Sequence, residues 1–283
     1  MFVEAMDKMT NPTPLVTNAE KSYFMKLIVL AKQVPDSGGT RKLDPETGIL
    51  DRTATEAVPD EITERALECA LQVKDQNTAV EVVVLTVGPV GAENSIRQLL
   101  AMGADRAVHI VDDSLMGADM LQTARVITAA LEKERFDLVL AGDQSTDGRG
   151  GMLPSIVAGF LDVPILPDLE EIDITQESVR GSMKTETSEL RLESAFPAVA
   201  AVTERVAEAR FPNFKGIRAA KKKPVEVLSL SDLGCEVDPI NSSTRSVMVS
   251  AIPAQPKSGG TKLIDDGTSV EQLAAFLESK HLI

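Results

Sequence analysis

Four short apolar runs constrain the fold of this chain more than any other sequence feature. They are KLIVLA at 26–31, EVVVLTV at 81–87, AVHI at 107–110 and LVLA at 138–141. Each has the length of a strand and is mainly apolar rather than alternating, which is typical of strands buried on both faces of a sheet. Stretches with the character of helices separate these runs, at 59–74, 92–102 and 118–133. Strands separated by such helices predict βαβ units, and therefore an α/β fold with a mainly parallel sheet sandwiched by helices.

The pattern changes after Pro164. Three segments alternate polar and apolar residues, which predicts a small antiparallel extension with one face in water. These segments span 170–174, 178–186 and 189–193. The run at 198–203 is apolar again and is expected to return to the main sheet, and 224–230 is a final strand candidate. The segment 208–218 (EARFPNFKGIR) contains Pro and Gly and lacks a period, so we expect a loop with exposed aromatic side chains there.

This pattern divides the chain into three regions. Residues 1–24 are polar, and we expect a disordered extension rather than a secretory signal, or else an upstream start with the functional beginning at Met25. Residues 25–230 are predicted to form the α/β domain. Residues 231–283 are predicted to form an arm, which 269–279 closes as an amphipathic helix. Such an arm is expected to pack on a partner chain, and folding back on its own domain is the alternative.

The composition argues against several classes of function. The net charge of −14 disfavours nucleic acid and anionic membrane surfaces as partners. No apolar run approaches the roughly 20 residues that cross a bilayer. We expect no membrane insertion, and we also expect a cytoplasmic location. Cys69 and Cys235 lie far apart in the sequence, and His109 and His281 are the only histidines. The chain therefore has few residues that could form a zinc site or a histidine-based catalytic triad. Any chemistry is expected to belong to a cofactor or a partner.

The stretch 136–164 joins a buried strand to a helix through a glycine-rich turn. The turn contains Gly142, Gly148, Gly150 and Gly151. Pro154 suits the first turn of the following helix, and four apolar residues mark one face of that helix. These are Ile156, Val157, Phe160 and Leu161. A strand, a glycine-rich turn and a helix amino terminus together present N–H groups and a positive dipole end to a phosphate. The spacing matches neither of the two best-known phosphate motifs, so a plain tight turn is the alternative.

Several stretches taken in order resemble the β subunit of electron-transfer flavoproteins. The opening KLIVLAKQVPD is similar to that family's first strand and turn, and DEITERALECA at 60–70 resembles its first helix. IRQLLAMGAD at 96–105 and DLVLAGDQSTD at 137–147 are also similar to the family's sequence at these places. The most specific part is the block that runs from ELRLESAFPAVAAV through VAEARF to IRAAKKK at 217–223. The resemblance covers nearly everything from Met25 to the C-terminal helix.

The resemblance implies an electron carrier without catalytic residues of its own and without a metal. It implies a heterodimer with an α subunit that holds most of a FAD, and a structural AMP in this subunit. Electrons would pass from acyl-CoA and related dehydrogenases to a membrane quinone reductase. All implied AMP contacts lie at carboxyl ends of parallel strands or at the following helix starts. They are Leu30, Asp60, Glu61, Ile62, Thr63, Val87, Gly142, Asp143, Gln144, Ser145, Thr146, Asp147, Gly148, Arg149, Gly150, Gly151, Met152 and Leu153.

The chain departs from the family at three places. Asp60 stands where Asn is common, and a carboxylate cannot donate as an amide does. Ser37 stands where some members have an aromatic residue near the flavin. Gly148 is followed by Arg-Gly-Gly, and Arg149 is expected to pair with phosphate, with a solvated side chain as the alternative. A sub-family that splits electron pairs binds a second FAD at this site and commonly continues Asp-Thr-Ala-Gln after Asp-Gly. Because this chain departs after Gly148, AMP is favoured over a second FAD.

The resemblance also implies a partner-docking loop at 208–223. The family's anchoring apolar residue falls on Phe214, and an exposed aromatic that fills a partner's pocket is a plausible hot spot. The alternative is that Phe214 packs against its own sheet. Three lysines follow, which either attract acidic partners or form a solvated face. They are Lys221, Lys222 and Lys223.

Two other classes of protein compete with the carrier interpretation. An ATP-hydrolysing or adenylylating enzyme would need a phosphate-binding lysine or a set of metal-binding carboxylates near the turn. Asp143 and Asp147 are present, but no lysine lies within the turn. A nucleotide-sensing module akin to universal stress proteins would share the sheet, but it leaves Phe214 and the arm unexplained.

Overall fold

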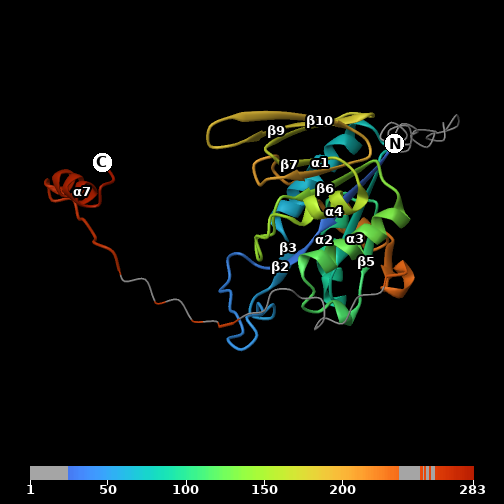
Figure 1. Cartoon of the computed structure of the whole chain (residues 1–283), viewed down its shortest axis with the longest axis horizontal. Helices are drawn as coiled ribbons and strands as arrows, with labels where there is room; N and C mark the ends of the chain where they lie inside the picture. The colour runs from blue at the N-terminus through green and yellow to red at the C-terminus, as the bar shows by residue number, and fades with distance from the viewer. Residues whose placement is uncertain (1–24, 236–248, 251, 253–254, 256–258) are drawn as a thin grey trace, which may run out of the picture.

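A seven-stranded sheet forms the centre of the molecule (Figure 1). The structure, a computed structural model, describes residues 25–235, 249–250, 252, 255 and 259–283, so the predicted extension at 1–24 lies outside the described residues. The strand order is β12-β5-β4-β1-β6-β11-β7, and every neighbouring pair runs parallel. The strands are β1 (Lys26–Ala31), β4 (Glu81–Val87), β5 (Arg106–Ile110), β6 (Leu138–Gly142), β7 (Ile165–Leu169), β11 (Ala198–Val202) and β12 (Val225–Leu228). The predicted α/β class is confirmed.

Helices cover both faces of this sheet, so its strands are buried on both sides. One core contains Leu27 and Val29 of β1 with side chains of α1 (Glu61–Gln76) and α2 (Glu93–Met102). The other contains Ile28 and Leu30 with side chains of α3 (Met120–Glu134) and α4 (Leu153–Leu161). Because successive strand residues point to opposite faces, one short apolar run serves two cores. Single turns of 3-10 helix lie at η1 (Val90–Ala92), η2 (Asp113–Leu115) and η3 (Ser231–Leu233).

Two smaller sheets and two further helices complete the described chain. The predicted antiparallel extension is present, with strand order β10-β9-β8. Its strands are β8 (Glu171–Ile174), β9 (Ser178–Lys184) and β10 (Glu189–Ala195). A two-stranded sheet pairs β2 (Gln33–Pro35) with β3 (Ala57–Pro59). Helix α5 (Phe214–Ala220) packs on α2, and α7 (Ser269–Ser279) has no buried residue and lies apart from the main body (Figure 1). Among the described residues, none of the helices is both long and apolar enough to cross a membrane.

The loop expected at 208–218 is present over 208–213, and its aromatic side chains Phe211 and Phe214 are exposed as expected, but α5 begins at Phe214. Asn213 caps this helix by accepting a hydrogen bond from the Gly216 N–H at 2.8 Å. Gly216 made the helix hard to predict, because glycine is uncommon inside helices. Glycine is needed at this position, since a Cβ would lie 2.3 Å from the carbonyl oxygen of Ala101. The predicted buried face of α4 also needs correction: Val157 is fully buried, but Phe160 is exposed.

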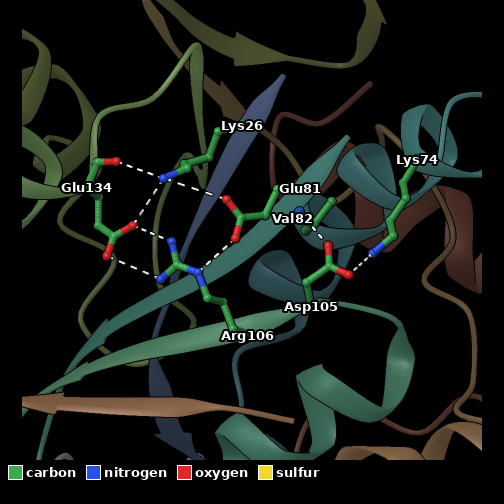
Figure 2. Close-up of polar contacts among 7 residues, drawn as sticks. All are labelled: Lys26, Lys74, Glu81, Val82, Asp105, Arg106 and Glu134. Carbon is green, nitrogen blue, oxygen red and sulfur yellow. Dashed lines mark hydrogen bonds and ion pairs between the residues drawn. The ribbon is translucent and has the colours of Figure 1, made fainter. Parts of the chain in front are cut away.

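Charged side chains form a network at the amino ends of the central strands (Figure 2). Arg106 Nε donates to Glu81 Oε1 at 2.8 Å, and its guanidinium also binds both carboxylate oxygens of Glu134. Lys26 Nζ donates to the Glu134 carbonyl oxygen at 2.8 Å. Burial alone would raise the pKa of Glu134, but the hydrogen bond and charge of Arg106 outweigh it and lower that pKa. The network joins β1, β4, β5 and α3 at one edge of the sheet.

Candidate functional site

The strand order places a topological switch point at the opposite, carboxyl-terminal edge of the sheet. The chain leaves β1 toward α1 on one face, and it leaves the neighbouring β6 toward α4 on the other face. Connections that diverge in this way leave space between the strand ends, and ligands of open α/β sheets bind at such points. The glycine-rich stretch from the end of β6 to the start of α4, residues 142–153, lies at this switch point, and we call it the nucleotide loop.

Glycines let the nucleotide loop pass close to two helices. A Cβ on Gly142 would lie 2.8 Å from Ile62 Cγ2 at the start of α1. A Cβ on Gly150 would lie 2.7 Å from the Met120 sulfur at the start of α3. Gly151 has a φ of 64°, in the left-handed region that favours glycine, and Arg149 shares that region with a φ of 48°. The loop therefore lies directly against the amino ends of both helices.

Asp60 joins the start of α1 to the nucleotide loop. Its Oδ1 accepts a hydrogen bond from the Ile62 N–H at 3.0 Å, so Asp60 is the N-cap of α1. Its Oδ2 accepts from the N–H and the hydroxyl of Thr146, at 2.7 and 2.9 Å. All three partners are donors, so a carboxylate serves this buried position well. The role of Asp60 in the structure is to hold the loop.

Basic side chains from outside the loop converge on Asp147. Its carboxylate is only 1% exposed and lies 2.7 Å from Lys32 Nζ and 2.9 Å from an Arg52 nitrogen. Lys32 also donates to the Ser145 hydroxyl at 3.1 Å. Burial alone would raise the pKa of Asp147, but the hydrogen bond and charge of Lys32 hold it well below its ordinary value. Arg41 donates to the Thr146 carbonyl oxygen, and its Nε is buried without a hydrogen-bond partner among the described residues.

The sequence interpretation missed Lys32, Arg41 and Arg52. A signal existed for Lys32, because it directly follows β1 and so had to lie at the carboxyl edge. Arg41 and Arg52 lie in an irregular segment, 36–56, whose ends are joined by the hydrogen bond from the Asp36 N–H to the Glu56 carbonyl at 2.9 Å. Nothing local in the sequence shows that this segment folds back on the nucleotide loop.

The remaining predicted nucleotide residues divide into two groups. Leu30 is buried near the end of β1, and Val87 is half-buried at the end of β4, on the same edge as the loop. Ile62 and Thr63 are buried in the first turn of α1, whereas Glu61 is exposed and accepts from the Ser37 hydroxyl at 2.9 Å. Within the loop, half-buried residues precede exposed ones, apart from Leu153. The half-buried residues are Asp143, Gln144, Ser145, Thr146 and Leu153, and the exposed ones are Gly148, Arg149, Gly150, Gly151 and Met152.

Asp143 lies in an environment different from that of Asp147. Burial raises the pKa of its carboxyl group, and the negative charges of Asp168 and Glu204 raise it further. Among the described residues, no group of His, Cys, Asp and Glu side chains could hold a metal ion.

The predicted docking residues lie on and after α5, away from the nucleotide loop. Phe214 begins α5 and is 82% exposed. Lys221 and Lys222 are exposed, but Lys223 points inward and its Nζ donates to the Leu100 carbonyl at the end of α2, at 2.9 Å. Burial, together with the charge of Lys74, lowers the pKa of Lys223. Lys223 therefore differs from Lys221 and Lys222, because its ammonium binds the Leu100 carbonyl group of α2 instead of lying exposed.

Comparisons with known proteins give a consistent result. The electron transfer flavoprotein domain matches residues 47–233. An electron transfer flavoprotein subunit beta of Mycobacterium tuberculosis is 42% identical over 263 residues, which covers 91% of this chain and 99% of that protein. The protein of the same description from Mycobacterium leprae is 42% identical over 264 residues, with the same coverage. A caffeyl-CoA reductase-Etf complex subunit, CarD of Acetobacterium woodii, is 34% identical, with 90% of this chain and 97% of that protein covered.

Proposed function

We propose that this chain, which belongs to the electron transfer flavoprotein family as a β subunit, forms a heterodimer with an α subunit and carries electrons. In this proposal the α subunit binds most of a FAD, and this subunit binds an AMP. Acyl-CoA dehydrogenases and related enzymes donate the electrons, and a membrane quinone reductase accepts them. When bound, FAD supplies the electron transfer, whereas AMP supplies structure only.

The convergence of Lys32, Arg41 and Arg52 on the nucleotide loop is the observation that carries the AMP assignment. Two of these cations share a single carboxylate, that of Asp147, and Arg41 buries a donor without a partner. In a chain of net charge −14, such a group of cations favours an anionic ligand. The loop glycines allow backbone N–H groups to approach a phosphate closely, as at other helix amino termini. These features fit the phosphate of a nucleotide.

Each part of the edge has a proposed role toward AMP. Arg149 on the exposed part of the loop adds a further guanidinium for the phosphate. Leu30 and Val87 offer apolar surface for the adenine at the strand ends. Asp60 acts indirectly, because the protein already uses both of its carboxylate oxygens, and it keeps Thr146 in place.

Nucleotide analysis of the purified heterodimer tests this assignment. Heat or acid releases bound nucleotides, and chromatography against standards gives their amounts per heterodimer. We expect one FAD and one AMP. Two FAD and no AMP would overturn the proposal.

Two FAD and no AMP per heterodimer is the result expected from a competing function. The relative of 34% identity is a subunit of a caffeyl-CoA reductase-Etf complex. This similarity favours, as the alternative, that the present chain also works in a complex with a reductase. In that form, this subunit binds a second FAD at the nucleotide loop, and electron pairs are split between two acceptors.

We also propose that α5 and the segment before it dock the electron donor. Phe211, Phe214 and Ile217, which we call the docking surface, are exposed apolar side chains within seven residues of one another. Exposed aromatic residues are frequent hot spots of protein interfaces. The exposed Lys221 and Lys222 lie beside them and would attract acidic groups of a donor. Phe214→Ala should slow reduction of the heterodimer by an acyl-CoA dehydrogenase while its FAD content stays normal, and unchanged kinetics would remove the docking role.

A further inference from the structure

Two arginines attach the segment between β11 and α5 to helix α1. Arg65 of α1 donates to the carbonyl oxygen of Ala207. Arg210 donates from Nε and Nη2 to the two carboxylate oxygens of Glu68, at 2.7 and 2.9 Å. Its Nη2 also donates to Asp75 Oδ2 at 2.8 Å. Segment 207–210 is irregular, and these contacts attach it to α1 in addition to the packing of Ala207 and Ala209 against the core.

The attachment at Glu68 fixes the backbone as well as the side chain of Arg210. The N–H of Arg210 donates to Glu68 Oε2 at 3.2 Å, so one carboxylate receives three hydrogen bonds from one residue. The Glu68 side chain is only 7% exposed, and a buried carboxylate requires such partners. Bidentate pairing of a guanidinium with a carboxylate has a defined geometry. The direction in which the chain continues to Phe211 is therefore fixed.

The opposite end of α5 is also attached to a neighbouring helix, α2. Arg97 of α2 donates to the carbonyl oxygens of Ala220 and Lys223, both at 2.9 Å. Gly216 brings α5 into close contact with the end of α2, where a side chain would meet Ala101. Between these two anchors Phe211 is 95% exposed and Phe214 is 82% exposed. The large aromatic side chains thus lie in solvent on a segment whose ends are both fixed.

We infer that Arg210, through its pairing with Glu68, is a positioning residue that presents the docking surface to the electron donor. This inference rests on the docking role proposed above. An interface segment that is already ordered loses less conformational entropy on binding than a loose one, so it binds more tightly for the same contacts. Arg210 itself points toward α1, and it acts on the donor only through Phe211 and Phe214.

Two variants of the chain, within the intact heterodimer, test the inference. Arg210→Lys keeps a positive charge beside Glu68, which favours folding, but it loses the bidentate geometry. The double variant Glu68→Gln with Arg210→Gln removes both charges, so neither is left buried alone. Asp75→Asn is the matched control, because Asp75 is the exposed, outer partner of the same guanidinium.

The measurement is steady-state reduction of the heterodimer by an acyl-CoA dehydrogenase, with the heterodimer as the varied electron acceptor. We expect both variants to raise KM about tenfold, with kcat changed less than about twofold and with FAD and AMP contents unchanged. Amide hydrogen exchange at residues 211–217 should become faster in both variants, because their attachment is weakened. Asp75→Asn should leave KM within about twofold of the unaltered protein.

The outcomes separate this inference from the docking role itself. If KM stays normal in both variants while Phe214→Ala raises it, the docking surface is correct and the positioning role of Arg210 is wrong. If Phe214→Ala leaves KM unchanged as well, the docking proposal fails and the inference fails with it.

Discussion

Asp147 shows how individual residues determine the geometry of the nucleotide loop. A buried carboxylate is costly unless it is paired, and here Lys32 and Arg52 approach it from two different segments of the chain. Together with the bonds from Thr146 to Asp60, this arrangement ties the loop to the end of β1, to the segment 36–56 and to the start of α1. The charges that would bind a phosphate are therefore also the ones that hold the loop.

The lowered pKa of Asp147 predicts a pH dependence of stability. Its folded pKa lies below its unfolded value of about 4, so the pairing stabilises the protein fully above pH ~4 and is lost as the pH falls below that value. Asp147→Asn should therefore lower the free energy of unfolding by about 1–3 kcal/mol at pH 7, and by less as the pH falls below ~4. Urea unfolding of the heterodimer at several pH values measures this difference.

The control for this prediction is Asp113→Asn, which alters an exposed carboxylate in η2. Its effect should stay within about 0.5 kcal/mol at every pH. A difference between Asp147→Asn and the unaltered protein that is the same at pH 7 and below pH 4 would contradict the pairing described here.

At the scale of elements, local pattern predicted the sheet and its covering helices but not the contacts between distant segments. β1 and α1 have clear periods, because each must bury a defined face, and both were predicted within a few residues. β2 and β3 have three residues each, which is too short for a periodic pattern to predict them. The cations of 36–56 could not be placed either, because Arg41 and Arg52 reach the loop through tertiary folding of an irregular segment.

The close contact of the nucleotide loop with α1 can be tested through its glycines. Gly142→Ala places a Cβ against Ile62, so the loop and α1 must separate, at a cost of about 1–3 kcal/mol in unfolding free energy. We also expect less AMP per heterodimer, measured by nucleotide release. Gly159→Ala is the control: it lies exposed inside α4 with free space for a Cβ, and alanine there should be neutral or stabilising by up to about 1 kcal/mol. Equal AMP loss in both variants would contradict a specific role of Gly142.

The whole molecule places two different sets of charged side chains at the two edges of one sheet. Arg106 and its carboxylate partners lie where the parallel strands begin (Figure 2), and the nucleotide loop lies where the strands end. A parallel sheet places all strand ends of one kind together, so each edge can acquire its own set of side chains. The docking surface on α5 occupies a third place, on the helical layer formed by α1 and α2.

This separation predicts that the amino-terminal edge can be weakened without loss of nucleotide. Glu134→Gln removes a carboxylate that binds Arg106 and lies beside Lys26, while Glu81 keeps Arg106 paired. We expect a loss of about 1–3 kcal/mol in unfolding free energy at pH 7, since a half-buried guanidinium loses one of its two carboxylates. Effects at distant sites without shared partners are nearly independent. FAD and AMP contents should therefore match those of the unaltered heterodimer, and AMP loss as large as that of Gly142→Ala would show that the two edges are coupled.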